Sequence, residues 1–409
     1  MNRGHGEQGT GNGHALPPFP VPRSPVVRIP PAVKGLALVS LFNDFASEMV
    51  YPLLPAFVTV TLGGSATTLA ALDGAADLAS AATKWASGDL ADRPRWRKPL
   101  IVLGYFSAIL IRPLVALAGA AWQVVGFRVL DRIGKGLRTP ARDAMIADVT
   151  APPIRGRAFG FHRAADHFGS IPGSLIAWWL LSHSVDIRQV LSLSVLPGLL
   201  AAVILLVVLR GTPGHQAAGP VGDAVAAPTG RVFWAPVLTL AALALLRLPE
   251  TLLLLRLQDL GVAVAIIPLV WAGLHGVRTL VSYPGGWLAD HLGPRSTVAA
   301  GGACFAAGAV VLGLPLTVPL AIGAFLGLGT VAGLTESAER SLVARLSPRR
   351  TGRGFGAYHG TTGLVALPAA LLFGALYQRW GAPTALWASA AGILLTTLLW
   401  LAVSPAGRT

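Results

Sequence analysis

Long apolar stretches alternate with short polar turns along most of the chain. Six stretches of helix length lie at 35–61, 67–88, 99–119, 121–147, 157–182 and 187–209, and six more lie at 231–258, 264–288, 296–314, 317–346, 353–378 and 383–403. Each is close to the about 20 residues that a helix needs to cross the hydrocarbon of a bilayer. The pattern predicts an all-α polytopic membrane protein with twelve transmembrane helices.

The segments between and around these stretches divide the chain. Residues 1–33 are rich in Gly, Pro and polar side chains, which predicts a disordered cytoplasmic tail rather than a signal peptide. Residues 211–230 have the composition of a flexible cytoplasmic linker, and 405–409 form a short C-terminal tail. We therefore expect one six-helix bundle at 34–210 and a second at 231–404.

Composition supports the membrane prediction. Hydrophobic residues make up 53% of the 409 residues and charged residues only 12%, against about 25% charged in soluble domains. The formal charge of +14 suggests nucleic acid at first, but the basic residues gather in turns between apolar stretches, so we expect no nucleic-acid partner. With Cys304 as the sole cysteine, an intrachain disulfide and a thiolate metal cluster are excluded.

The basic turns also predict an orientation. Lys and Arg occur in the turns after the second, fourth and tenth stretches, whereas the turns near 63–64, 119–120 and 314–315 carry none. Because loops on the cytoplasmic side are enriched in Lys and Arg, both termini are expected to face the cytoplasm.

One polar turn recurs at half-chain spacing. The aspartates of its two copies lie 198 residues apart, and the segments 157–160 and 353–356, both Arg-x-Phe-Gly, repeat with an offset of 196. An offset kept over such a span predicts two similar halves. The residues of the turn are Gly88, Asp92, Arg93 and Arg97 in the first copy and Gly286, Asp290 and Arg295 in the second.

Ionisable residues interrupt the apolar stretches. A charged side chain at the bilayer centre costs about 2.5–3.5 kcal/mol on insertion scales, so these residues are expected to line an interior rather than to face lipid. The candidates for a proton or substrate site are Asp44, Glu48, Asp73, Asp77, Arg128, Asp131, Arg132, Asp143, His162, Asp166, Glu250, His275, Glu336 and Glu339.

Spacing relates several of these candidates to one another. Asp44 and Glu48, like Asp73 and Asp77, are four residues apart and share a helix face, and two carboxylates on one face repel unless one holds a proton. At least one of the four is expected to bind the coupling proton or a cationic substrate. The alternative is that these acids and the interior bases form structural ion pairs that neutralise each other. Much of the basic stripe on 121–147 is expected to pair with these acids.

Two further relations follow from spacing. His162 and Asp166 are also four apart, which lets the carboxylate orient the imidazole. The repeat offsets relate Asp77 to His275 and Asp143 to Glu339, and these counterparts are expected to face each other across a central cavity.

The repeated pattern Gly-x-Leu-Ala-Asp-Arg, followed by basic residues, resembles the loop between the second and third helices of the major facilitator superfamily (MFS) of secondary transporters. The resemblance covers about 34–403, and Arg128 with Gly134 and Pro140 resembles an Arg…Gly…Pro motif of the bacterial proton-coupled branch. It implies that Asp92 clamps the helix that begins near Gly352, and that Asp290 clamps the helix that begins near Gly156.

The expected function is proton-coupled transport of a small molecule by alternating access, in the direction of efflux by antiport across a bacterial inner membrane. One alternative is an uptake symporter for an organic anion, based on Arg128, Arg132, Arg138 and Arg142. Another is a divalent-metal exporter that uses Asp44, Glu48, Asp77, His162 and His275.

An enzyme is disfavoured. The chain has no Gly-x-Ser-x-Gly, His-Glu-x-x-His or phosphate-binding Gly-Lys-Ser motif. We expect no catalytic residue, no cofactor, no resident metal and a monomeric carrier in the lipid bilayer.

Overall fold

The computed structural model describes residues 28–54, 57–64, 66–211, 230–263, 266–347 and 350–404. The predicted N-terminal tail is described only from Arg28, and the predicted linker and C-terminal tail lie almost wholly outside these ranges. The side chain of Asp73 also lies outside the described part of the chain.

The first half of the chain forms a bundle of long helices. Its elements are α1 (Pro31–Val50), η1 (Tyr51–Leu53), η2 (Phe57–Thr61), α3 (Ala66–Ala91), α4 (Pro94–Leu114), η3 (Val115–Leu117), α5 (Ala121–Val149), η4 (Pro152–Ile154), α6 (Arg155–Ser182), α7 (Ile187–Leu193) and α8 (Val195–Gly211). α7 and α8 together make one span, and α1 continues directly into η1.

The second half repeats this plan. Its elements are α9 (Arg231–Leu246), α10 (Glu250–Asp259), α11 (Ile267–His291), α12 (Pro294–Leu312), α13 (Val318–Gly327), α14 (Gly329–Leu346), α15 (Thr351–Leu364) and α16 (Ala366–Val403). Within α16 the backbone breaks at Gly381, whose φ of 83° suits glycine, and Pro383 opens the last span. The described ranges hold helices and no strand, which confirms the predicted twelve-helix fold.

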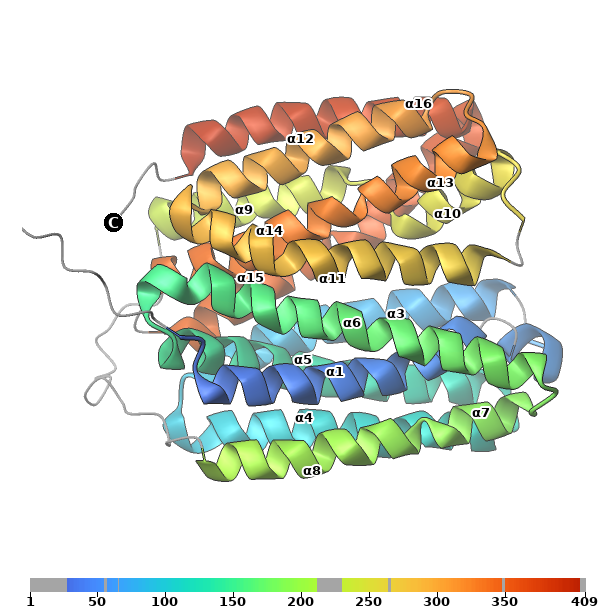
Figure 1. The fold of residues 1–409 in the computed structure, drawn as a ribbon, viewed down its shortest axis with the longest axis horizontal. Coiled ribbons are helices and arrows are strands. Elements are labelled where there is room, and N and C mark those ends of the chain that lie inside the picture. The colour runs from blue at the N-terminus through green and yellow to red at the C-terminus, as the bar shows by residue number, and fades with distance from the viewer. Residues whose placement is uncertain are drawn as a thin grey trace, which may run out of the picture.

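The two halves lie side by side (Figure 1). α6 of the first half packs along α11 of the second, and α3 packs along α15. α1 begins and α16 ends at the same end of the molecule, at the left in Figure 1. The turns between α3 and α4 and between α11 and α12 lie at this end too, and we call it the aspartate end because they carry Asp92 and Asp290.

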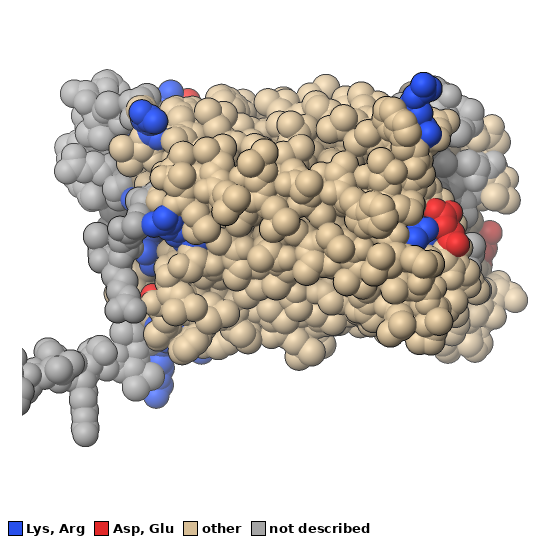
Figure 2. Space-filling view, turned by 90° about the horizontal axis from the view of Figure 1, so that it is seen from above, with Lys and Arg blue, Asp and Glu red and all other residues tan. Residues whose placement is uncertain are grey.

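The exterior fits a bilayer. Figure 2 shows a broad band without charged side chains across the middle of one face, with Lys, Arg, Asp and Glu at its two edges. Among the described residues, 6 helical segments are long and apolar enough to cross a membrane. α3, α5 and α6 are outside this group, and they carry many of the interior charges.

Candidate functional site

At the aspartate end, each turn aspartate binds the start of a helix from the opposite half. Asp92 accepts hydrogen bonds from the backbone N–H groups of Gly352 at 2.6 Å and Arg353 at 3.0 Å. Asp290 accepts from Gly156 at 2.7 Å and from Arg157 at 2.9 Å. Both contacts were predicted, and their physical basis is the attraction of a carboxylate to the free N–H groups at a helix N-terminus.

Close backbone contact between the halves makes these bonds possible. A Cβ atom at Gly88 would lie 2.9 Å from the carbonyl oxygen of Gly352, and one at Gly286 would lie 2.2 Å from that of Gly156. Any side chain at either position would push the two helices apart. The glycines of the repeated turn are therefore needed for closure.

The basic residues of the turns have different roles. Arg97 is buried, donates to the carbonyl oxygen of Ala91 at 2.8 Å and forms an ion pair with Asp148. Arg295 donates to the carbonyl oxygen of Leu401, and Arg93 is exposed. Burial raises the pKa of Asp92 to about 6, although its two backbone hydrogen bonds act in the opposite direction.

Deeper in the molecule, Asp143 of α5 joins the two halves. Its Oδ2 lies 2.8 Å from Nε2 of His359 and 3.4 Å from Nε of Arg340, both in the second half. Its Oδ1 accepts two hydrogen bonds from Arg142, at 3.0 and 2.9 Å. A carboxylate with no exposed surface is thus held by three basic side chains.

A second crossing contact is the counterpart of the first. Arg163 of α6 forms an ion pair with Glu336 of α14, and Arg340 lies 3.6 Å from the same carboxylate. Arg163 and His359 are 196 residues apart, the offset of the second repeat. We call the contacts of Asp143 and Glu336 the inner layer and those of Asp92 and Asp290 the outer layer.

The contacts of Asp143 and Glu339 give no support to the prediction that the two residues face each other. Glu339 accepts a hydrogen bond from Tyr358 within its own half, whereas Asp143 binds His359. Helix rotation explains the difference, because Glu336 lies nearly one turn before Glu339 and meets the other half in its place.

The basic stripe of α5 also differs from expectation. Arg112 of α4 donates to Asp131 at 3.1 Å and to the carbonyl oxygen of Asn43 at 2.8 Å, and Arg128 lies 3.6 Å from Asp131. Arg138 donates to the carbonyl oxygen of Gly104 and lies over the ring of Tyr105. Arg128 and Arg138 thus contact groups of α5 itself, of α4 and of η1.

A group of charged residues remains beside the stripe. Asp44 and Glu48 of α1, Lys84 of α3, and Arg132 and Lys135 of α5 are each partly exposed within the bundle. Oε2 of Glu48 and Nε of Arg132 are buried atoms without a hydrogen-bond partner. Among the described residues, no ion pair within 4.0 Å joins these acids to these bases.

The remaining candidates are dispersed. His162 Nδ1 lies 3.8 Å from Asp166, which is also bound by Arg163, and exposed Glu250 pairs with Arg278. The ring of His275 lies 5.5 Å from that of His167, and both ring nitrogens of His275 lack a hydrogen-bond partner among the described residues.

Two predictions about these candidates are not supported. Asp77 is exposed, and no contact joins it to its repeat counterpart His275 in the described structure. The second is the alternative of a divalent-metal exporter, because no three His, Cys, Asp or Glu side chains in the same ranges are grouped to hold a metal ion.

Several contact residues were missed in the sequence. Arg163 could have been found, because it is the repeat counterpart of His359. No comparable signal in the sequence pointed to Arg112 or His167, because their partners lie on other helices and no repeat or spacing relates them.

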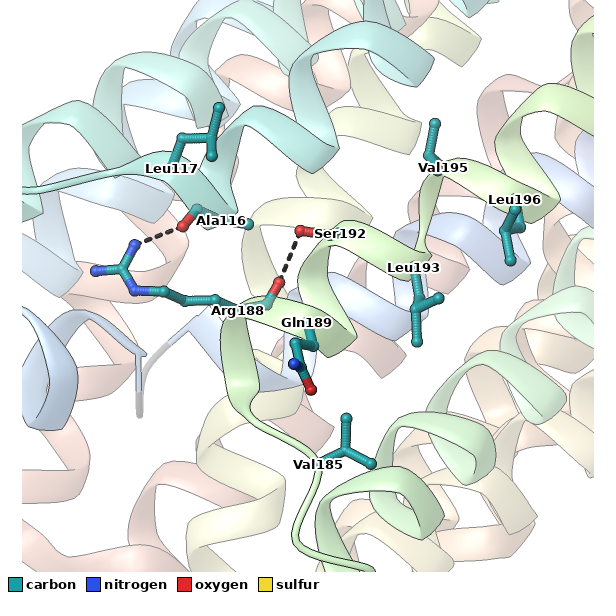
Figure 3. A pocket seen from close by; sticks show the side chains of 9 residues that line it. All are labelled: Ala116, Leu117, Val185, Arg188, Gln189, Ser192, Leu193, Val195 and Leu196. Atoms are coloured by element: carbon teal, nitrogen blue, oxygen red, sulfur yellow. Dashed lines mark hydrogen bonds between the residues drawn. The ribbon is translucent and has the colours of Figure 1, made fainter.

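One hollow lies away from all of these groups. It has a volume of about 700 Å³ and opens beside η3, α7 and α8 of the first half alone. Figure 3 shows its mostly apolar lining, in which Arg188 donates to the carbonyl oxygen of Ala116 and Ser192 donates to that of Arg188. Since this hollow is shallow and belongs to one half, the charged group near α1 is the better candidate site.

Comparisons with known proteins agree with this architecture. The family model described as Major Facilitator Superfamily matches residues 36–274 and 248–409. An uncharacterized MFS-type transporter of Methanocaldococcus jannaschii is 28% identical over 89% of this chain and 93% of its own length. Multidrug resistance protein MdtH of Photorhabdus laumondii is 30% identical over 33% of each chain. The structure of the human organic anion transporter MFSD10 (TETRAN) has a TM-score of 0.73 at 16% identity, covering 91% of this chain and all of that one.

Proposed function

Because the chain belongs to the Major Facilitator Superfamily and is thus a membrane transporter rather than an enzyme, we propose that it moves a small molecule by proton-coupled alternating access. Its proton site is the carboxylate pair of Asp44 and Glu48 on α1. The transporter works as a monomer in the bacterial inner membrane, with the aspartate end and both termini in the cytoplasm.

The two layers of crossing contacts support alternating access. Asp92, Asp290, Asp143 and Glu336 each bind groups of the opposite half, and all of these contacts lie between the middle of the molecule and the aspartate end. The structure is therefore closed at this end. Rupture of both layers opens it and exposes the interior group to the cytoplasm.

Glu48 is the observation that carries proton coupling. Its Oε2 has no hydrogen-bond partner, and Asp44 is its nearest acidic neighbour, so the ionised pair is poorly stabilised. Uptake of one proton by the pair relieves the repulsion of the two carboxylates. Asp44 already accepts a hydrogen bond from Asn43 at 2.9 Å, which leaves Glu48 as the preferred proton carrier.

The direction of transport depends on how proton and substrate affect each other. Export by exchange requires that proton and substrate compete for the interior site. The relative named multidrug resistance protein MdtH, which matches a third of this chain, supports export. Uptake by symport requires that they bind together, and the bases Lys84, Arg132 and Lys135 beside the proton site favour this second candidate.

Infrared difference spectroscopy of the purified protein tests the proton site without a known substrate. Acidification of the wild type should produce the carbonyl band of a buried protonated carboxyl group. Because Asp92 also takes up a proton near pH 6, the comparison is made in an Asp92→Asn background. There Glu48→Gln should remove this band, whereas Asp186→Asn, at an exposed position, should retain it. An unchanged band in Glu48→Gln combined with Asp44→Asn would refute proton binding by the pair.

A further inference from the structure

Five bases form a stripe on α5, and the structure satisfies only part of it. Arg128 faces Asp131 and the ring of Tyr51, Arg138 binds Gly104 and the ring of Tyr105, and Arg142 binds Asp143. Arg132 and Lys135 remain, and the side chain of neither makes a hydrogen bond or an ion pair within 4.0 Å among the described residues.

Helix packing brings a third base to these two. A Cβ atom at Gly136 would lie 2.6 Å from Cβ of Thr83, so α5 and α3 touch at this level. Lys84 follows Thr83, Lys135 precedes Gly136, and Arg132 lies one turn before Gly136 on α5. Arg132 is the largest source of electrostatic repulsion on Lys135 and the largest charged source on Lys84.

We propose that Lys84, Arg132 and Lys135 form the substrate site of the carrier and that the substrate is a small organic anion. This inference rests on the proposed function and decides between its two directions. Three like charges in a membrane interior repel, and an anion that bridges them relieves this repulsion while it pairs with the donors that have no partner.

Local structure favours a soluble anion over a lipid. The three bases are partly exposed inside the bundle, with Asp44 and Glu48 on the facing helix α1. Lys84 also interacts electrostatically with Arg340 and Asp143, so the site is close to the inner layer. A substrate held there is closed off from the aspartate end by the contacts of His359 and Arg163.

The charges around the site fix the sign of coupling. Asp131, Asp143 and Asp166 are held ionised by arginines in contact with them, so their charges stay constant. Among the described residues, Asp44 and Glu48 make no ion pair with an arginine within 4.0 Å, and they repel an anion until they take up a proton. The charged groups that act electrostatically on the acids and bases of the site are Asp77 on α3, Arg128, Arg138 and Asp143 on α5, Arg163 and Asp166 on α6, and Arg340 on α14.

Protonation of Asp44 or Glu48 therefore tightens anion binding, and the bound anion favours protonation. Proton and substrate move together, which is symport. Because the proton gradient across a bacterial inner membrane is directed inward, this coupling drives uptake.

Thermal stabilisation of the purified full-length protein in an uncharged detergent tests the site. The probes are benzenesulfonate and ethane-1,2-disulfonate, whose charges do not change with pH, and benzyltrimethylammonium as a cation, all at equal ionic strength. The sulfonates should raise Tm in a saturable manner, and more at mildly acidic than at neutral pH. Lys135→Gln and Arg132→Gln should each weaken their binding about tenfold or more, since a hydrogen bond to a charged group is lost.

Arg210→Gln is the matched control, because it removes an exposed base of α8 far from the site and should leave sulfonate binding unchanged. Stabilisation by the cation and not by the sulfonates would overturn the proposal. So would stabilisation by phosphatidylglycerol in mixed micelles without any response to the sulfonates, which would indicate a lipid headgroup.

The inference and the proposed function can fail separately. Loss of sulfonate binding with an intact infrared carboxyl band would refute the anion site and leave proton coupling standing. Sulfonate binding that is the same at both pH values in the wild type would refute the prediction that protonation tightens anion binding. Glu48→Gln should abolish the pH dependence of sulfonate binding while binding itself persists.

Discussion

His359 of α15 lies 2.8 Å from Asp143 of α5, although 216 residues separate them in the sequence. His359 occupies the same repeat position as Arg163, which pairs with Glu336. The inner layer thus uses a titratable imidazole on one side and a permanently charged guanidinium on the other. Each half supplies one carboxylate and basic partners for the carboxylate of the other half.

Asp143→Asn should destabilise the protein by roughly 3–5 kcal/mol, because it removes the charged partner of the buried Arg142 and leaves Arg340 with Glu336 alone. Denaturant unfolding in detergent would measure the change. Glu250→Gln removes an exposed carboxylate that pairs with Arg278 and should cost less than about 1 kcal/mol. Equal costs for the two variants would contradict the assigned role of Asp143.

Gly286→Ala should open the outer layer, because the added methyl group would meet the backbone of Gly156. Hydrogen exchange at the amides of Gly156 and Arg157 should accelerate about tenfold or more, since both amides lose the Asp290 carboxylate. Gly276→Ala, on the same helix with open space around it, is the control and should leave this exchange unchanged. Unaltered protection in Gly286→Ala would contradict this prediction, because the helices would then accommodate the methyl group without losing the hydrogen bonds to Asp290.

Asp92 should make closure depend on pH. Burial raises the pKa of Asp92 to about 6 in the closed structure, whereas an opened Asp92 in water has its usual value of 3.8. The closed state therefore binds a proton more tightly, and closure becomes more favourable as pH falls through about 6, by up to roughly tenfold per unit of pKa difference.

The protection factors of the Gly352 and Arg353 amides, corrected for intrinsic exchange, would measure this dependence. Asp92→Asn should remove it and should impair transport with little loss of folded protein. The neighbouring groups Arg97, Asp148, Asp89 and Arg353 are unchanged in this variant. Persistence of the same pH dependence in Asp92→Asn would assign it to another group.

Arg112→Lys should destabilise the first half by about 1–3 kcal/mol. Nε of Arg112 donates to Asp131, while one Nη donates to the carbonyl and side-chain oxygens of Asn43. A lysine ammonium lacks this planar arrangement of donors and leaves buried acceptors unsatisfied. Thermal unfolding in detergent would measure the loss, and a wild-type Tm in Arg112→Lys would show that the three contacts are dispensable.

The outer layer could be predicted because its signal is local and duplicated. Asp92 and Asp290 lie in the repeated turn, and the helices that they bind begin with the repeated Arg-x-Phe-Gly segments. The inner layer could not be predicted in the same way. Asp143 was singled out correctly as an interior charge, yet its partner His359 was found only in the structure.

The sequence by itself determined the twelve helices and their division into two similar halves, because apolar length and repeat spacing are properties of the chain. The contacts of the turn aspartates were predicted from the resemblance of the repeated turn to the loop of the superfamily. Only the tertiary structure decided which interior charges are paired. The rotation of each helix about its axis turns Arg138 to Gly104 and Glu336 to Arg163. It leaves the side chains of Arg132 and Lys135 without an ion pair within the described part of the chain. That rotation is fixed by packing between helices far apart in the chain, such as the contact of Gly136 with Thr83, and no local pattern encodes it.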